Sequence, residues 1–316
     1  MEGRAGRHRR AWRALHAHHA PTIHRPSVTA RPSGPAADRY AQLRGVDRAH
    51  PRRRAVGPVT GAAHRCAIVT GAADGLGRGV TERLLTDGWC VVAADISPAV
   101  GDTFAAGAFD GRVRATIADI ATADAGDALV RTAMASYGRI DAIVNNAGVG
   151  GPSGDLDVVE MADVERTLEV NLLGPVRLCR AAIPLLKAQK SGRIVNIGSL
   201  FADRPVVGGS AYIMSKSALR SLSQCLALEL GPSGITVNTV APGYMMTKMH
   251  EEEVAAQARS AGVDSDEKLL QLRAEVPLRR HGDGADVAGA VAWLLSDDAA
   301  YVTGQTIAVN GGVQVS

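Results

Sequence analysis

The chain has 316 residues, of which 46% are of hydrophobic type, and its formal net charge is +3. No apolar run reaches the roughly 18 residues that a membrane-spanning helix needs, so we expect no membrane segment. The charge is divided unevenly, because residues 1–64 hold 13 Arg against three acids, whereas residues 65–316 hold 22 basic and 29 acidic residues. The larger part is therefore mildly acidic, and we expect it to bind no nucleic acid.

Residues 1–64 contain seven of the nine His and six of the 14 Pro, with little apolar periodicity. This composition favours disorder, because the segment cannot bury enough apolar surface to offset its ordering entropy. No apolar stretch follows Arg9-Arg10, which argues against a secretory or twin-arginine signal. A dispensable or upstream-extended start, a mitochondrial transit peptide and a weak polyanion-binding tail remain open. We predict a basic extension over 1–64 and one dinucleotide-binding catalytic domain over 65–316.

The domain opens with a short apolar strand over 66–70, followed by a glycine-rich turn and a helical stretch over about 76–86. The glycines let the backbone approach a pyrophosphate, and the helix N-terminus presents free N–H groups to the anion. The string Val59-Thr60-Gly61 repeats part of this motif without a preceding strand, so context favours the second copy. We predict a phosphate-binding turn formed by Gly71, Asp74, Gly75, Leu76 and Gly77.

The next strand, over 90–94, ends in Asp95, which lies 24 residues after Gly71. An acidic residue at about this distance is placed to accept hydrogen bonds from the adenosine ribose hydroxyls. It would also repel the 2′-phosphate of NADP, and neither Arg nor Lys lies beside it. Asp74 further occupies the turn where a positive charge could have met that phosphate. The two acids favour NAD over NADP.

Further strands are predicted over 113–117, 140–144, 193–198, 235–240 and 305–309, with helices over 123–137, 163–189, 212–230 and 284–295. Such alternation predicts an α/β fold, a single doubly wound parallel sheet with helices on both faces and ligands at the carboxyl ends of the strands. Pro175 predicts a break within 163–189, with one helix ending near Asn171 and another starting near Gly174.

Tyr212 and Lys216 are four residues apart and share one face of a predicted helix, with Ser199 upstream. An ammonium near a phenol stabilises the phenolate, so we expect the pKa of Tyr212 to fall from about 10. Such a tyrosine can act as a general acid or base, while a serine hydroxyl holds a carbonyl oxygen in place.

Taken together, these motifs resemble the short-chain dehydrogenase/reductase family, with its Rossmann-like fold, over residues 65–316. Asn145-Asn146-Ala147-Gly148, Asn171 and the ending Asn310-Gly311-Gly312 match the family in order. The resemblance implies a catalytic set in which Tyr212 carries the proton, Lys216 assists it, Ser199 orients the carbonyl and Asn171 holds a relay water. It implies that the cofactor is contacted by Gly71, Asp74, Gly75, Leu76, Gly77, Asp95, Ile96, Asp119, Ile120, Asn146, Ala147, Gly148, Tyr212, Lys216, Pro242, Gly243, Met245 and Thr247. Met245 departs from the branched aliphatic residue that many relatives have.

The resemblance and the Asp95 argument predict an oxidoreductase that transfers a hydride between NAD(H) and a secondary alcohol or polyol, or its ketone. The alternative is an NADPH-dependent 3-oxoacyl-(acyl-carrier-protein) reductase, for which Arg177 and Arg180 could meet an acidic carrier. A relative that binds nucleotide without turnover is a third possibility. Residues 244–275 form a charged candidate lid over a small-molecule substrate. Resemblance also implies a homo-oligomer, a tetramer or a dimer.

The four cysteines, Cys66, Cys90, Cys179 and Cys225, are scattered through predicted strands and helices, and core packing explains them. They suit a reducing, cytoplasmic compartment. Only His250 and His281 lie outside the extension, and no C-x-x-C spacing occurs, so we expect no metal site.

Overall fold

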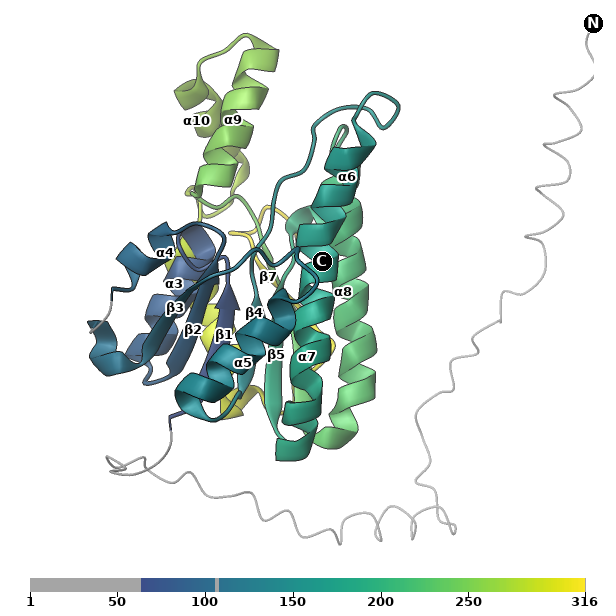
Figure 1. The fold of residues 1–316 in the computed structure, drawn as a ribbon. Helices are drawn as coiled ribbons and strands as arrows, with labels where there is room; N and C mark the ends of the chain where they lie inside the picture. Colours follow the sequence, from purple (N-terminus) through teal and green to yellow (C-terminus); the bar gives the residue numbers. More distant parts are fainter. Residues whose placement is uncertain (1–63, 106–107, 316) are drawn as a thin grey trace, which may run out of the picture. The chain divides into compact units, whose positions relative to one another are not determined.

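The computed structural model describes residues 64–105 and 108–315, so the predicted extension lies outside the described residues except for His64. Seven strands form one sheet in the order β3-β2-β1-β4-β5-β6-β7, and every neighbouring pair is parallel (Figure 1). The strands are β1 (Cys66–Thr70), β2 (Cys90–Asp95), β3 (Val113–Ile117), β4 (Ala142–Asn145), β5 (Gly192–Ile197), β6 (Ile235–Pro242) and β7 (Thr306–Val309). The predicted α/β fold with a doubly wound parallel sheet is confirmed.

Helices cover both faces of this sheet. They are α3 (Gly75–Thr86), α4 (Ala99–Thr103), α5 (Ala125–Tyr137), α6 (Met161–Leu168), α7 (Gly174–Gln189), α8 (Ser210–Leu230), α9 (Lys248–Ala261), α10 (Ser265–Glu275) and α11 (Gly284–Leu294). The core on one face joins α5, α7 and α8 to the sheet through residues such as Leu129, Leu178 and Leu230. The opposite core joins α3 and α11 through Leu84 and Val291.

The central strands β1, β2, β4, β5 and β6 are buried on both faces, which explains why they read as continuous apolar runs, whereas the edge strands β3 and β7 are partly exposed. All five residues of β1 are buried, and so are all eight of β6. The strand order reverses at β1, whose two neighbours are β2 and β4, and such a switch point opens a crevice at the carboxyl ends of the strands. Gly71, Asp95, Asn146 and Ser199 all lie at or just after strand ends, so the sheet gathers them at one edge.

The predicted break at Pro175 is replaced by a π-helical turn, Glu169–Leu173, between α6 and α7. The N–H of Gly174 donates to the carbonyl oxygen of Glu169, which widens the turn without ending the helix. Pro175 lies in the first turn of α7, where a missing N–H is tolerated best. The prediction located the irregularity correctly but mistook its form.

The candidate lid is a pair of helices, α9 and α10, which Figure 1 shows standing off the end of the sheet where the strands finish. Thr247 and Asp264 begin these helices by accepting hydrogen bonds from the backbone N–H groups of His250 and Asp266. No helix among the described residues is long and apolar enough to cross a membrane.

The four cysteines do not all serve the core. Cys66, Cys90 and Cys179 are buried, as predicted, but Cys225 on α8 is exposed. Core packing therefore does not explain Cys225, because its place on the helix turns it away from the sheet.

Candidate active site

The glycine-rich turn after β1 brings the backbone close to the start of α3. Gly71 and Gly75 have positive φ angles of 67° and 54°, which residues with a side chain rarely adopt. A Cβ at Gly77 would collide with the carbonyl oxygen of Gly71. Asp74 is the N-cap of α3, and its Oδ1 accepts from the N–H of Gly75 at 2.6 Å. The turn thus presents backbone and a helix N-terminus without bulky side chains, which fits a pyrophosphate.

A second set of contacts locks this turn to the end of β4. Thr70 Oγ1 accepts hydrogen bonds from the N–H groups of Asn146 and Ala147, both at 3.1 Å. Asn146 Nδ2 donates to the carbonyl oxygens of Thr70 and Gly71, at 2.9 and 3.0 Å. Side chains therefore replace the strand pairing that ends here, and the switch-point crevice has fixed walls.

Asp95 ends β2 beside the same turn. Its Oδ2 accepts from the N–H of Ala73 at 2.9 Å, and its Oδ1 accepts from the N–H of Ser97 at 2.8 Å. A carboxylate has about four acceptor positions, so these two bonds orient the group and leave it further capacity. The neighbouring Ile96 is 59% exposed and contributes no charge.

The two residues expected on the adenine side lie after β3. Asp119 Oδ1 accepts from the N–H of Ala121 at 3.0 Å, and its Oδ2 accepts from Arg166 Nη2 at 3.1 Å. Ile120 is buried, and its side chain lies so close to Gly174 that a Cβ at Gly174 would meet it at 2.9 Å. Asp119 is thus tied to α6, and Ile120 packs against the start of α7.

The segment after β6 closes the crevice from the other side. The N–H of Gly243 donates to the carbonyl oxygen of Val309 at 2.9 Å, and the buried Met245 pairs with Gly282 in a parallel bridge. The side chain of Thr247 faces Gly75, whose added Cβ would lie 3.2 Å from Thr247 Cγ2. Pro242–Thr247 therefore lies opposite the glycine-rich turn.

Ser199, Tyr212 and Lys216 come together at the start of α8. Ser199 caps the short helix that follows β5, with its Oγ accepting from the N–H of Phe201 at 3.2 Å. Ser199 also lies near the side chain of Tyr212, whose pKa it lowers. Lys216 Nζ lies 5.8 Å from the centroid of the Tyr212 ring and donates to the carbonyl oxygen of Ile197 at 2.8 Å. A hydroxyl, a phenol and a buried amine thus share one small region.

The expected fall in the pKa of Tyr212 is contradicted, because burial raises it above its ordinary value. The hydrogen bond from Ser199 opposes this rise, and the negative charge of Glu253 adds to it. Burial also lowers the pKa of Lys216 to about 8. The i, i+4 spacing brought the two groups near each other, but the largest effect on the pKa of Tyr212 is desolvation of the buried phenol.

Asn171 lies in the π-helical turn and is fully buried. Its Oδ1 accepts from the N–H of Val149 at 2.8 Å, and its Nδ2 donates to the carbonyl oxygen of Val149 at 2.9 Å. Nδ2 also donates to Ser215 Oγ at 3.0 Å. Gly148 lies between Asn171 and Lys216, since a Cβ there would meet Asn171 Oδ1 at 3.2 Å and Lys216 Nζ at 3.4 Å. Asn171 therefore links the segment that follows β4 to α8, close to the Lys216 amine.

The sequence prediction missed a ring cluster at the base of the lid. Tyr244 stacks on His250 with ring centroids 5.7 Å apart, and His281 meets both rings edge-on at 6.3 and 5.2 Å. Glu253 Oε2 lies 3.8 Å from His250 Nδ1. The three rings come from separate segments, so no local spacing announces them. The one available signal was that His250 and His281 are the only histidines after residue 64.

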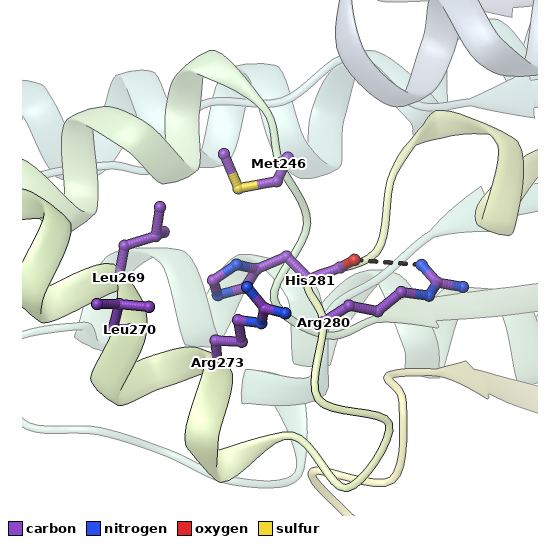
Figure 2. Close-up of a pocket in the computed structure, with 6 residues that line it drawn as sticks. All are labelled: Met246, Leu269, Leu270, Arg273, Arg280 and His281. Carbon is purple, nitrogen blue, oxygen red and sulfur yellow. Dashed lines mark hydrogen bonds between the residues drawn. The ribbon is translucent and has the colours of Figure 1, made fainter.

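Behind His281 lies a hollow of about 300 Å³. Figure 2 shows its lining, with the His281 ring near the Arg273 side chain and the apolar Leu269 and Leu270 on α10. Arg280 forms two hydrogen bonds of 2.6 Å with Asp286, which balances its charge. Among residues 64–105 and 108–315, no three His, Cys, Asp or Glu side chains gather in a way that could hold a metal ion.

Comparison with known proteins agrees with this geometry. Residues 71–314 match the family model described as Enoyl-(Acyl carrier protein) reductase. The chain is 34% identical over 255 residues to Dehydrogenase/reductase SDR family member 4 of Pongo abelii, covering 79% of this chain and 87% of that protein. It is 33% identical over 257 residues to the 3-oxoacyl-(acyl-carrier-protein) reductase FabG of Staphylococcus aureus strain Mu50, covering 79% of this chain and 98% of that protein. The structure of NAD⁺-bound xylitol dehydrogenase matches with a TM-score of 0.74 at 31% identity, covering 78% of this chain and 98% of that one.

Proposed function

The chain belongs to the short-chain dehydrogenase/reductase family and is an oxidoreductase that acts on CH–OH groups with NAD(P), and we propose that it interconverts a secondary alcohol or polyol and its ketone with NAD(H). In the oxidative direction the carbinol loses its C–H hydrogen with two electrons and its O–H hydrogen as a proton. The products are the ketone, NADH and one proton, so atoms and charge balance.

The placement of Asp95 is the observation that carries the choice of NAD. Its two hydrogen bonds to Ala73 and Ser97 orient the carboxylate beside the glycine-rich turn, where the adenosine ribose would lie. A charged carboxylate favours ribose hydroxyls as donors and repels a 2′-phosphate. Asp74 adds a second negative charge at the start of α3. We propose that the remaining residues which the resemblance assigns to the cofactor contact it too.

The proton chemistry falls to the residues at the start of α8. The cofactor, when bound, supplies the hydride acceptor or donor. Ser199 holds the substrate oxygen and Tyr212 takes or gives its proton, since the two side chains are close enough for Ser199 to lower the pKa of Tyr212. Lys216 keeps a cation beside the phenol and is anchored by Ile197. Asn171, held by both backbone groups of Val149, positions the helix backbone that would carry a proton relay toward solvent.

The identity to FabG of S. aureus supports a second candidate, an NADPH-dependent 3-oxoacyl-(acyl-carrier-protein) reductase. Such an enzyme needs cations that are free to meet an acidic carrier protein. Arg177 is already engaged, because its Nη2 lies 2.7 Å from Glu169 Oε2 and its Nη1 donates to the carbonyl oxygen of Ala121. Arg180 is exposed on the same helix, α7. We therefore rank this candidate second.

The proposal extends to assembly and location. A homo-oligomer is what the family resemblance implies, and the scattered cysteines suit the cytoplasm. Helix α8 supports an interface because Met214 and Leu228 on it are 47% and 82% exposed. The catalytic domain would comprise residues 65–316, with residues 1–64 as an extension. Light scattering coupled to size exclusion tests the assembly, with a monomer at micromolar concentration as the contrary result.

The proposed function is tested by titrating NADH and NADPH separately into the protein and then assaying two substrates. We expect tighter binding of NADH, together with NAD⁺-dependent oxidation of xylitol. Tighter binding of NADPH, with reduction of a 3-oxoacyl thioester and no oxidation of xylitol, would favour the second candidate. Binding of NADH without turnover of either substrate would favour a non-catalytic nucleotide sensor.

A further inference from the structure

The ring cluster of Tyr244, His250 and His281 lies where three segments meet. Tyr244 follows β6, His250 lies in the first turn of α9, and His281 lies in the loop before α11. The Tyr244 and His250 rings are nearly parallel, at 15°, while His281 meets them at 67° and 62°. The stacked rings of Tyr244 and His250 and the edge-on ring of His281 thus form one surface at the base of the lid, which we call the wall.

This wall is continuous with the catalytic residues. The Phe201 and Tyr244 ring centroids lie 6.5 Å apart, and the N–H of Phe201 donates to Ser199 Oγ. Glu253, one turn after His250, lies near both the wall and the catalytic tyrosine, because its charge raises the pKa of Tyr244 and of Tyr212. A substrate whose carbinol lies at Ser199 and Tyr212 would therefore extend toward this wall.

Two buried nitrogen atoms of the wall have no hydrogen-bond partner among the described residues. His250 is 7% exposed, yet its Nε2 is buried with no hydrogen-bond partner among the described residues, and the same is true of His281 Nε2. Buried polar atoms in folded proteins are almost always hydrogen-bonded, so a polar group entering here gains bonds that the protein itself does not make. Figure 2 shows His281 beside the Arg273 side chain, and burial, His250 and Arg273 lower the pKa of His281, which favours its neutral form.

The charges beside the wall define what it can accept. The Tyr244 hydroxyl donates to Glu275 Oε2 at 3.1 Å, and Glu253 Oε2 lies near His250. Carboxylates and neutral imidazoles accept hydrogen bonds from hydroxyl groups, whereas two carboxylates repel an anionic substrate. Arg204 and Arg273 are the opposing charges, since Arg204 lowers the pKa of Tyr244 and Arg273 lowers that of His281. Two acids against two bases leave no excess charge beside the wall, which favours a neutral ligand.

We infer that Tyr244, His250, His281 and Glu253 form a recognition site for the hydroxyl groups of a neutral polyhydroxylated substrate, and that they discriminate against substrates with a carboxylate at that position. This inference rests on the proposed function, because it assigns the substrate class of the same site. The four side chains select the substrate, and the chemical step remains with Ser199, Tyr212 and Lys216.

The test compares three five-carbon probes that differ in the groups beyond the carbinol: xylitol, 3-pentanol and 3-hydroxypentanoate. His250→Phe keeps a stacked ring but removes both nitrogens, and Glu253→Gln removes a charge from a side chain that is 43% exposed. We expect each variant to lower the pH-independent limit of kcat/KM for xylitol about 10-fold and to leave that limit unchanged for 3-pentanol. Glu253→Gln should also raise kcat/KM for 3-hydroxypentanoate.

Glu252→Gln is the matched control, because Glu252 is on the same helix, is 70% exposed and lies 4.0 Å from Lys248 alone among the described basic residues. The inference is overturned if the variants change kcat/KM for xylitol and 3-pentanol by the same factor, or if the wild type prefers 3-hydroxypentanoate, which would assign selection to the cations Arg204 and Arg273. Melting temperatures of all variants identify any that fail to fold, and Glu253→Gln then carries the test.

A failed proposed function gives a different result, namely no turnover of any probe by the wild type with either cofactor. Xylitol is then titrated into the protein–NADH complex by calorimetry, which needs no turnover. Binding that weakens about 10-fold in His250→Phe and Glu253→Gln, but not in Glu252→Gln, supports the recognition site. Binding that is absent, or equal in all four proteins, refutes it.

Discussion

The Lys216 ammonium donates a hydrogen bond to the carbonyl oxygen of Ile197 at 2.8 Å, which ties the middle of the active-site helix to the end of β5. Ile197 lies two residues before Ser199, so one bond sets the distance between the strand that carries the serine and the helix that carries Tyr212. The amine that resembles a catalytic group is therefore also a structural clamp. It is 4% exposed, and its burial has a cost.

That cost predicts that Lys216→Met stabilises the protein near neutral pH. The pKa of Lys216 is about 8 in the fold, against 10.5 for a free lysine. Between pH 8 and 10.5 the unfolded chain binds more protons than the folded chain, so the stability of the wild type rises with pH in this range. Below pH 8 the full cost of burying the Lys216 charge is present. The shift bounds the gain at about 3 kcal/mol, from which the lost bond to Ile197 subtracts about 1 kcal/mol.

Urea unfolding at pH 7, 8, 9 and 10 measures this effect. We expect Lys216→Met to exceed the wild type by about 2 kcal/mol at pH 7, with the gap closing toward pH 10. The same substitution at Lys187, an exposed residue near the end of α7, reports any general effect of removing a lysine. A variant that is less stable than the wild type at pH 7 would contradict the argument. Turnover should be lost in Lys216→Met.

The surroundings of Tyr212 predict two opposite shifts in the pH profile of alcohol oxidation. Oxidation needs the phenolate, whose pKa is raised by burial, lowered by the Ser199 hydrogen bond and raised by Glu253. Ser199→Ala removes the lowering contact, so the rising limb of kcat/KM should move to higher pH. Glu253→Gln removes the negative charge, so the limb should move to lower pH.

Measured kcat/KM for 3-pentanol between pH 6 and 10 tests both shifts, since this probe does not depend on the recognition site. Tyr212→Phe is the control and should lose at least about 100-fold in turnover while still binding NADH. If both variants shift the limb in the same direction, Tyr212 is not the group that titrates.

The strands and most helices could be predicted because the central strands are apolar runs buried on both faces and because glycine-rich or polar turns separate the elements. Every predicted strand lies within two residues of the observed one, from β1 to β7. The gathering of the motif residues at the crevice could be predicted as well, because parallel strands bring their carboxyl ends to one edge of the sheet. Local pattern and tertiary position agree in these segments.

Other features depend on contacts that local sequence does not encode. The π-helical turn at Asn171 arises where α6 and α7 meet with Val149, which lies 22 residues upstream. The pKa of Tyr212 depends on how deeply the phenol is buried, and spacing to Lys216 says nothing of depth. Tyr244 and His281 are 37 residues apart, so only the folded loop before α11 brings their rings together.

The close approach in the glycine-rich turn predicts that Gly77→Ala damages both stability and cofactor binding. A Cβ at Gly77 meets the Gly71 carbonyl oxygen and the Asn146 amide, which are held by fixed hydrogen bonds and cannot move aside. We expect a loss of about 2 kcal/mol or more in unfolding free energy and at least 10-fold weaker binding of NADH. Gly289→Ala on α11 is the control, because its Cβ would meet nothing within 4 Å.

Gly289→Ala should leave NADH binding unchanged and raise stability by about 0.5–1 kcal/mol, because alanine loses less entropy than glycine in a helix. Thermal unfolding and NADH titration of both variants provide the measurement. Equal NADH affinity in Gly77→Ala and the wild type would show that the turn does not hold the pyrophosphate.

Asp95 provides the sharpest test of cofactor choice, because charge and shape can be separated there. Asp95→Asn retains an oxygen that can accept from the N–H of Ala73, but it loses the charge that repels a 2′-phosphate. Ile96→Arg adds a cation at a position that is 59% exposed and so tolerates a long side chain. We expect the double variant to raise the ratio of NADPH to NADH affinity by at least 10-fold, about 1.4 kcal/mol, with Ile96→Arg alone giving a smaller rise.

Fluorescence titration with both reduced cofactors measures the ratio, and Ile96→Gln controls for the loss of the apolar side chain. A ratio that stays constant across all four proteins would mean that Asp95 orders the turn without reading the ribose, and the preference for NAD would then lose its physical basis.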